Sequence, residues 1–173
     1  VDFLSNNGNG LNLTYAVRDG IVCHNGESIS RRIVPTFKER DLSSLSSRSG
    51  LIPATYEGVV VRFSDSIAYL GRDFEDASRL GIVKGEDLPE VVKERLGTTN
   101  SQIITALVND LIEGADEENG IGFSEPVFEA VKAFSEFNYQ YIYRSKILNG
   151  YNRYFSRLLK LIVDYLEELY SSF

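Results

Sequence analysis

The sequence of 173 residues contains no methionine and no tryptophan, and only one cysteine, one histidine and four prolines. Because Cys23 is the single cysteine, a disulfide within the chain is excluded, and such sparse cysteine is typical of a reducing compartment. No apolar run approaches the ~20 residues that a membrane-spanning helix needs. These scarcities favour a protein that neither relies on disulfides nor spans a membrane.

Positive charge is also scarce, since 18 lysines and arginines stand against 25 aspartates and glutamates, for a net charge of −7. The pI of about 4.8 argues against a general nucleic-acid binder, which normally carries a basic surface. It does not argue against an enzyme that acts on nucleotides, because such a site needs only a few cations, often with a metal. With 43% hydrophobic residues, the chain is long enough for one domain with a core.

What the sequence does contain is a long helical pattern from Pro53 to Gly81. Proline fits the first turn of a helix, and glycine fits the position just past the last turn, where a positive φ is favourable. Between them, apolar residues recur at spacings of three and four and predict one buried face: Val60, Phe63, Ile67, Leu70 and Phe74. We expect the rest of the chain to be organised around this helix.

Four polar residues of the same helix share one stripe: Asp65, Tyr69, Asp73 and Asp76. Steps of four residues turn a helix only ~40° past a full circle, so the first three stack along it over ~12 Å. Asp76 returns to within ~20° of Asp65. The pattern alone leaves two interpretations open, because a stripe of acids with a tyrosine forms either a solvated face or one wall of a polar pocket.

Several stretches of the sequence resemble one known family in their order along the chain. They are LNLT at 11–14 with DGIVCH at 19–24, RFSDSIAY at 62–69 with Arg72-Asp73 and Glu75-Asp76, and the segments 103–112 and 137–143. Together they resemble HD-superfamily metal-dependent phosphohydrolases. The most similar branch is the deoxyguanosine-triphosphate triphosphohydrolase-like one, in its carboxy-terminal part.

The resemblance implies an all-α fold, namely a fragment of a helical HD-type domain with several helices packed orthogonally. Residues 1–85 would form the distal part of the catalytic domain, with a mobile loop at 25–52, and residues 86–173 a carboxy-terminal helical part packed on it. The metal-binding His and the His-Asp pair that name the superfamily precede this region in the family and have no counterpart here. We therefore expect the chain to be the carboxy-terminal part of a longer enzyme.

The resemblance also implies a reaction, in which a deoxynucleoside triphosphate and water give the deoxynucleoside and inorganic triphosphate. In the family a divalent metal such as Mn²⁺ or Mg²⁺ is held by two His and two Asp side chains, and Asp65 matches the second Asp. One aspartate does not hold a catalytic metal, so we expect the isolated chain to be inactive and to bind no metal tightly. Further expectations are a homo-oligomer, a cytoplasmic location, and no membrane or nucleic-acid partner.

Five residues are candidates for contacts with the substrate. By motif position, the Tyr69 ring lies against the sugar or base, and the Asp73 carboxylate accepts a hydrogen bond from the 3′-hydroxyl. Arg144 and either Tyr151 or Tyr154 are the nearest matches to an Arg and a Tyr that reach the triphosphate or sugar in the family. Their alternative role is to pack over a helix junction. His24, expected at the end of a helix, is either structural or site-lining.

The rest of the chain predicts further helices and one irregular segment. We expect a helical tail at 1–4, helices at 11–24, 87–96, about 100–112 and 124–137, and an amphipathic helix at 158–169 that packs in the core or against another subunit. Residues 25–52 are serine-rich and carry Arg31 and Arg32, which either meet phosphates or lie in a solvated loop. Alternating aromatics at 137–143 suit a strand, but we expect a helix because no partner strand is evident nearby.

The alternative function is a non-catalytic helical module for interaction or regulation, which keeps an HD-like fold without the metal ligands. In that case the acidic stripe is an ordinary solvated surface, and the core is complete. A start codon just before Val1 would favour this alternative. A long upstream reading frame with separated His and His-Asp residues would favour the enzyme.

Overall fold

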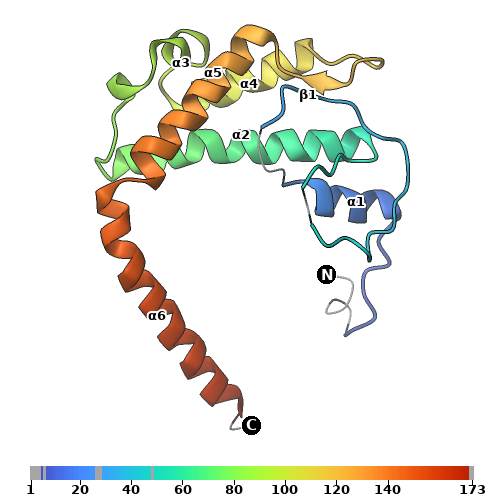
Figure 1. Cartoon of the computed structure of the whole chain (residues 1–173), viewed down its shortest axis with the longest axis vertical. Coiled ribbons are helices and arrows are strands. Elements are labelled where there is room, and N and C mark those ends of the chain that lie inside the picture. The colour runs from blue at the N-terminus through green and yellow to red at the C-terminus, as the bar shows by residue number, and fades with distance from the viewer. Residues whose placement is uncertain (1–4, 6, 26–28, 48, 172–173) are drawn as a thin grey trace.

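The computed structural model describes residues 5, 7–25, 29–47 and 49–171, most of which are helical (Figure 1). The prediction of an all-α fold is therefore confirmed, and the helical tail expected at 1–4 lies outside the described residues. In chain order the elements are α1 (Tyr15–Cys23), β1 (Arg32–Ile33), α2 (Tyr56–Arg79), the 3₁₀ turn η1 (Gly85–Asp87), α3 (Glu90–Arg95), α4 (Asn100–Glu113), β2 (Ile121–Gly122), α5 (Glu125–Phe137), the π-helical turn η2 (Asn138–Tyr143) and α6 (Lys146–Ser171).

Helix α2 runs through the centre of the molecule, with α1 on one side and α3, α4 and α5 on the other (Figure 1). Thr55 caps its start, because the side-chain oxygen accepts a hydrogen bond from the Gly58 amide at 3.2 Å. The expectation that Pro53 lies in the first turn is wrong, since Pro53 precedes this cap. The predicted end is confirmed, because Gly81 follows the last turn with a φ of 70°.

The buried face of α2 agrees with the prediction except at its first member. Phe63, Ile67, Leu70 and Phe74 are buried, whereas Val60 is 50% exposed and Val59 is buried in its place. Val59 precedes Phe63 by four residues, so it continues the same buried face and belongs to the same core cluster. Gly20 of α1 packs instead on Gly58, where a Cβ atom on Gly20 would stand 3.7 Å from the Gly58 Cα.

Edge-to-face aromatic pairs join α2 to the elements packed on it. The Phe63 ring lies 5.3 Å from that of Phe123, and the Phe74 ring lies 5.7 Å from that of Phe134 in α5. The same core cluster includes residues on both sides of position 85, so the two parts of the chain share one core. The domain division predicted at that position stays a prediction.

Helix α1 is shorter than the 11–24 segment predicted for it, and it buries an unexpected face. Its buried residues are Asp19, Gly20 and Cys23, while the apolar Val17 and Ile21 are about half exposed. Apolar periodicity therefore identifies the helix but not the side that packs on α2.

The buried face of α1 centres on the carboxylate of Asp19, which is 1% exposed. One of its oxygens accepts a hydrogen bond from the Ala54 amide at 2.7 Å, and the other lies 3.4 Å from Nε of Arg40. The ion pair with Arg40 ties α1 to the irregular segment, and the hydrogen bond from Ala54 ties it to the residues that lead into α2.

The irregular segment 25–52 is anchored to the rest of the fold over its described part. Strand β1 pairs antiparallel with β2, which the sequence did not predict. Nη1 of Arg32 donates to the carbonyl oxygens of Gly114 and Gly120, both at 3.0 Å, and Arg31 makes a surface ion pair. Arg32 thus holds the turn that follows α4, while the mobility expected for 25–52 stays a prediction.

Helices α3, α4 and α5 lie close to their predicted positions. At the start of α4, the Thr99 hydroxyl accepts from the Gln102 amide, and the Gln102 side chain accepts from the Thr99 amide. This reciprocal cap explains why the helix begins where it does. Helix α3 starts three residues later than expected, because η1 occupies the positions before it.

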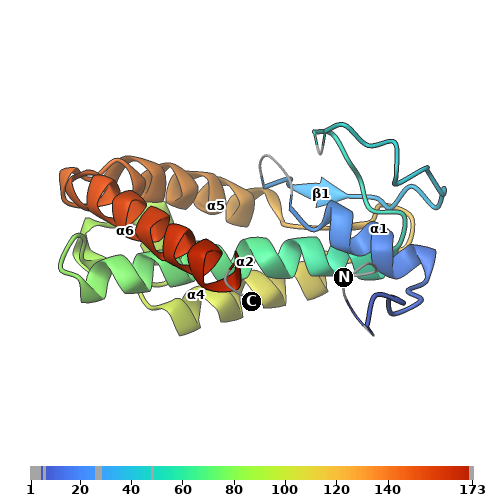
Figure 2. The same ribbon diagram turned by 90° about the horizontal axis from the view of Figure 1, so that it is seen from below.

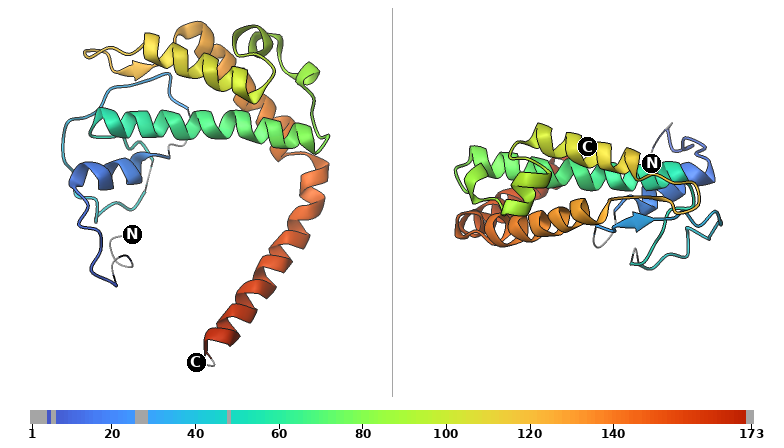
Figure 3. Two further views of the ribbon diagram at one scale, coloured as in Figure 1. Left: turned by 180° about the vertical axis from the view of Figure 1, so that it is seen from behind. Right: turned by 90° about the horizontal axis from the view of Figure 1, so that it is seen from above.

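Helix α6 leaves the body at the end of α5 and projects from the same side of α2 as α1 does (Figures 1 and 3). Seen from below, it lies in front of α2 (Figure 2). Leu148 is half-buried, but every residue from Asn149 to Ser171 is exposed. The helix expected at 158–169 is present as part of α6. The expectation that it packs in the core is wrong, because its residues are exposed, and a contact with another subunit stays a prediction. No helix in the described part of the chain is long and apolar enough to cross a membrane.

Candidate functional site

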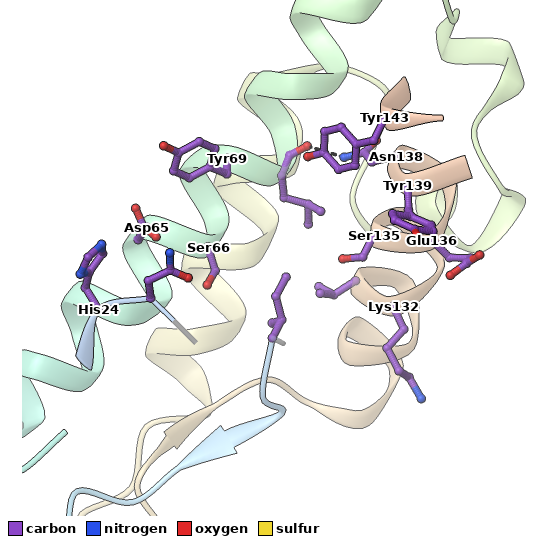
Figure 4. A pocket seen from close by; sticks show the side chains of 14 residues that line it. His24, Asp65, Ser66, Tyr69, Lys132, Ser135, Glu136, Asn138, Tyr139 and Tyr143 are labelled. Carbon is purple, nitrogen blue, oxygen red and sulfur yellow. Dashed lines mark hydrogen bonds between the residues drawn. The ribbon is translucent and has the colours of Figure 1, made fainter. Parts of the chain in front are cut away.

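A recess of about 800 Å³ opens between α2 and α5 and also receives residues from the end of α1 (Figure 4). Its lining is a mixture of aromatic rings, hydroxyls, amides and a few charges. The lining residues are His24, Asn25, Ile29, Asp65, Ser66, Tyr69, Leu70, Val131, Lys132, Ser135, Glu136, Asn138, Tyr139 and Tyr143. Both walls are helices packed through the core, so their side chains are held on rigid elements.

The α2 wall contains part of the polar stripe identified in the sequence. Asp65 and Tyr69 line the recess, with Asp65 half-buried and Tyr69 64% exposed. Asp73 does not line it, but it is bound by Tyr143, which does. Asp76 lies outside, in a surface ion pair with Arg72 at 3.4 Å. The stripe is therefore the wall of a polar recess at one end and a solvated face at the other.

The opposite wall is built by α5 and the π-helical turn that follows it. The Arg144 amide donates to the Tyr139 carbonyl at 3.2 Å, five residues back, which is the hydrogen bond that defines a π-helix. Such a turn contains more residues per turn than an α-helix, so it changes which side chains face α2. Here Tyr139 and Tyr143 both face the recess.

A hydrogen bond joins the two walls where α2 and the π-helical turn meet. The Tyr143 hydroxyl donates to the carboxylate of Asp73, and both side chains are only partly exposed. Burial first, and the Asp73 carboxylate second, raise the pKa of Tyr143 well above its ordinary value. Tyr143 is thus held as a neutral phenol that donates, and it fixes the orientation of Asp73.

Replacing Tyr143 by phenylalanine is expected to lower the free energy of unfolding by about 1 kcal/mol, because one charge-assisted but partly solvated hydrogen bond is lost. The raised pKa also sets a pH dependence. Above pH about 10 the unfolded state loses the Tyr143 proton first, so wild-type stability falls as the pH rises, and Tyr143→Phe removes this contribution. Urea unfolding between pH 8 and pH 11 measures both effects.

The matched control is Tyr141→Phe in the same turn, since the Tyr141 hydroxyl makes no hydrogen bond within the described part of the chain. Its stability should follow the wild type over the same pH range. A Tyr143→Phe variant that is as stable as Tyr141→Phe at pH 8, with an unchanged pH profile, would show that the bond to Asp73 contributes nothing.

Asn138 is a buried amide at the junction of the walls, with 1% exposure. Its Nδ2 donates to the Leu70 carbonyl of α2 at 3.0 Å, while its Oδ1 has no hydrogen-bond partner among the described residues. A buried acceptor without a partner costs stability. Asn138 therefore fixes the π-helical turn against α2 and leaves one acceptor beside the recess.

His24 lies just past the last residue of α1, as predicted, and lines the recess on the same side as Asp65 (Figure 4). Its Nδ1 lies 2.6 Å from the Ile21 carbonyl oxygen. Because a carbonyl oxygen only accepts, this contact is a hydrogen bond when Nδ1 is the donor, and it leaves Nε2 without a hydrogen bond among the described residues. The ring thus combines the structural and site-lining roles that the sequence left as alternatives.

Two other candidates do not line the recess. The Arg144 guanidinium lies 4.7 Å from the centre of the Tyr139 ring in a cation–π arrangement, and Arg144 itself is not among the lining residues. Tyr151 is exposed on α6 beside Phe155, with 6.3 Å between ring centres. Their contacts with a substrate stay predictions. Sequence reasoning instead missed Ser135, Asn138 and Tyr143, although the segment 137–143 was singled out for its aromatics.

The described residues do not form a metal site by themselves. Within 5, 7–25, 29–47 and 49–171, no group of three or more His, Cys, Asp or Glu side chains is placed to hold a metal ion. Asp65 and His24 share the recess, but a catalytic metal needs more protein ligands than two. The recess therefore supplies at most part of a coordination shell.

The fold and site thus define a mostly helical chain with a polar, aromatic recess between two packed helices. Over 167 residues, or 94% of its length, the chain is 34% identical to a deoxyguanosinetriphosphate triphosphohydrolase-like protein of Clostridium perfringens (strain SM101 / Type A). Proteins of the same name from Desulfatibacillum aliphaticivorans and Clostridium tetani are 32% and 35% identical over 95% and 82% of the chain. These matches support the resemblance inferred from the sequence.

The chain spans only about two fifths of the length of these relatives, at 43%, 44% and 37% respectively. No family model matches the chain. No solved structure matches it either.

Proposed function

We propose that this chain is part of a metal-dependent deoxynucleoside triphosphate triphosphohydrolase and that its recess binds the nucleoside end of the substrate. The named relatives support the reaction class. In this proposal the Tyr69 ring packs against the sugar or base, and Asp73, oriented by Tyr143, accepts a hydrogen bond from the 3′-hydroxyl. Asp65 contributes one ligand to a divalent metal, Mn²⁺ or Mg²⁺, whose other ligands belong to a longer chain.

The observation that carries the proposal is the sign of the charges in the recess. Besides His24, the charged lining residues are Asp65, Glu136 and Lys132, and Nζ of Lys132 is already 2.5 Å from a Glu129 carboxylate. A triphosphate needs several uncompensated cations. A nucleoside is neutral and needs ring surfaces and hydrogen-bonding groups, which the tyrosines and hydroxyls of this recess provide.

The proposal also covers the surroundings of the site. Val17 and Ile21 on α1 are half exposed although they are apolar, which suits a surface that further residues of a longer enzyme would cover. A cytoplasmic location and a homo-oligomeric state complete the proposal, as the resemblance implies.

The test joins this chain to the upstream part of its reading frame and measures the release of inorganic triphosphate from deoxynucleoside triphosphates with Mn²⁺ or Mg²⁺. We expect Asp65→Asn to remove the activity. Tyr69→Ala should raise KM by about tenfold, because stacking of this size is worth about 1.4 kcal/mol. Asp76→Asn is the matched control and should leave kcat and KM unchanged. The absence of triphosphate release from every deoxynucleotide would contradict the proposal.

The second candidate function is a non-catalytic interaction or regulatory module. It is favoured by one observation, namely that the described residues contain no cluster of three metal-binding side chains. The discriminating observation is the reading frame. A start codon immediately before Val1 favours the module, and an upstream frame with separated His and His-Asp residues favours the enzyme.

A further inference from the structure

Asn138 carries a polar side chain in a part of the fold that is otherwise apolar. The residue is 1% exposed, and both Phe137 before it and Ile142 one turn later are buried in the core. Nδ2 donates to the Leu70 carbonyl at 3.0 Å, but the buried Oδ1 has no hydrogen-bond partner among the described residues. Asparagine is seldom fully buried, and a buried acceptor without a partner lowers the stability of the folded chain. The amide therefore needs an explanation that the core itself does not supply.

The bond to Leu70 does not by itself require an asparagine. Leu70 lies inside α2, where its carbonyl oxygen also accepts from the backbone amide four residues later. That oxygen would keep a partner if the Asn138 amide were absent. A leucine has the same branched outline as an asparagine and is common in buried positions, so an apolar residue could fill this place. What only the asparagine offers is the unpaired Oδ1.

The unpaired acceptor belongs to a residue that lines the recess. Asn138 and Tyr69 come from opposite walls (Figure 4), and Tyr69 directly precedes the Leu70 whose carbonyl binds Asn138. In the proposed function the Tyr69 ring packs against the sugar or base. A base held by that ring therefore lies beside the junction where Asn138 joins the two walls.

The α2 wall adds two further acceptors to the recess. The Ser66 hydroxyl donates to the Arg62 carbonyl at 3.0 Å, so its oxygen is left to accept. Asp65 adds a carboxylate, whose oxygens accept. A carbonyl group on the edge of a ligand would meet such oxygens without a hydrogen to share, whereas an amino group brings two.

We propose that Asn138 selects the base, with Oδ1 accepting a hydrogen bond from an exocyclic amino group of the bound deoxynucleoside. This inference rests on the proposed function and adds the class of base to it. Oδ1 is covered in the free chain, so the base reaches it by displacing a side chain of the same turn. Tyr139, which lines the recess and is 47% exposed, has room to turn aside.

The first test uses the wild-type chain and two pairs of deoxynucleosides, with binding measured by titration calorimetry. Deoxyadenosine and deoxyinosine differ by an amino group and a carbonyl at one ring position, and so do deoxycytidine and deoxyuridine. In at least one pair we expect the amino member to bind about tenfold more tightly, because the carbonyl member leaves Oδ1 unpaired. Equal affinities within both pairs, or no binding by any of the four, would overturn the inference.

The second test is Asn138→Leu, which removes the acceptor and keeps a branched side chain in its place. The preference for the amino member should fall to about twofold or less, because Oδ1 is absent. The midpoint of urea unfolding should be no lower than that of the wild type, since the variant no longer buries an unpaired acceptor. A preference that survives in Asn138→Leu would overturn the inference. A clearly lower midpoint would show that the amide serves the fold, and would overturn it too.

The matched control is Asn100→Ala at the start of α4. Asn100 also has an Oδ1 without a hydrogen-bond partner among the described residues, but it does not line the recess. This variant should keep the wild-type preference between the paired deoxynucleosides. The proposed function is judged separately, by triphosphate release from the joined enzyme. Release without any preference for amino-bearing bases would leave that function standing and overturn the role of Asn138 alone.

Discussion

Replacing Asp19 by alanine is expected to lower the free energy of unfolding by about 3 kcal/mol, which is among the largest effects of any single substitution in this chain. The carboxylate is almost completely buried and accepts a hydrogen bond from the Ala54 amide at 2.7 Å. Its removal leaves that amide without an acceptor and the partly buried guanidinium of Arg40 without its counter-ion at 3.4 Å. Urea denaturation of the purified variant measures the loss.

The matched control is Asp41→Ala. Asp41 is exposed, and among the described residues it accepts hydrogen bonds from its neighbours in sequence, namely from Ser43 to the carboxylate at 2.6 and 2.9 Å and from the Ser44 hydroxyl to the carbonyl at 3.0 Å. We expect it to change stability by less than about 0.5 kcal/mol. An Asp19→Ala variant that is as stable as Asp41→Ala would show that the buried ion pair does not hold α1 on α2.

The second large effect is expected for Phe134→Ala in α5, at about 4 kcal/mol. Phe134 is fully buried, and its ring packs edge-to-face against Phe74 of α2 at 5.7 Å. Truncation removes this contact and leaves a cavity between the two helices that form the walls of the recess. The midpoint of urea unfolding should fall while its slope stays unchanged, since the surface exposed on unfolding is nearly the same.

Phe128→Ala in the same helix provides the comparison. Phe128 is half-buried at the edge of the core, with the ammonium of Lys132 5.2 Å from its ring centre. Because less apolar surface is lost, we expect a cost of about 1 kcal/mol. Equal losses in the two variants would show that the Phe134–Phe74 contact has no special role in joining α5 to α2.

The helices of this fold could be predicted because their signals are local. Apolar periodicity identifies α2, α4 and α5, and Gly81 and Thr99 mark helix ends through backbone chemistry that needs no distant partner. The β1–β2 pairing could not be predicted, since each strand has two residues and the pairing joins segments almost ninety positions apart. The burial of Asp19 was equally invisible, because it depends on Arg40 and Ala54.

The candidate site was predictable on one wall only. Asp65 and Tyr69 follow from the regular geometry of α2, so their shared face could be computed from the sequence. The other wall was not, because the π-helical turn at 138–143 changes the phase of the helix, and a count at 3.6 residues per turn misplaces the side chains after the turn. Arg144 and Tyr151 are the matches that the resemblance gives, and neither of them lines the recess. Asn138, Tyr139 and Tyr143 of the turn do line it.

The π-helical turn also has a mechanical consequence for everything that follows it. It accommodates an extra residue, so the deletion of one residue between 138 and 143 would allow an ordinary α-helix to form there. The chain beyond the deletion would then rotate by ~100° about the helix axis. Such a rotation would swing the phenol of Tyr143 off Asp73 and point α6 in a new direction. The π-helical turn and the non-helical Arg144 and Ser145 that follow it therefore form the joint between α5 and α6.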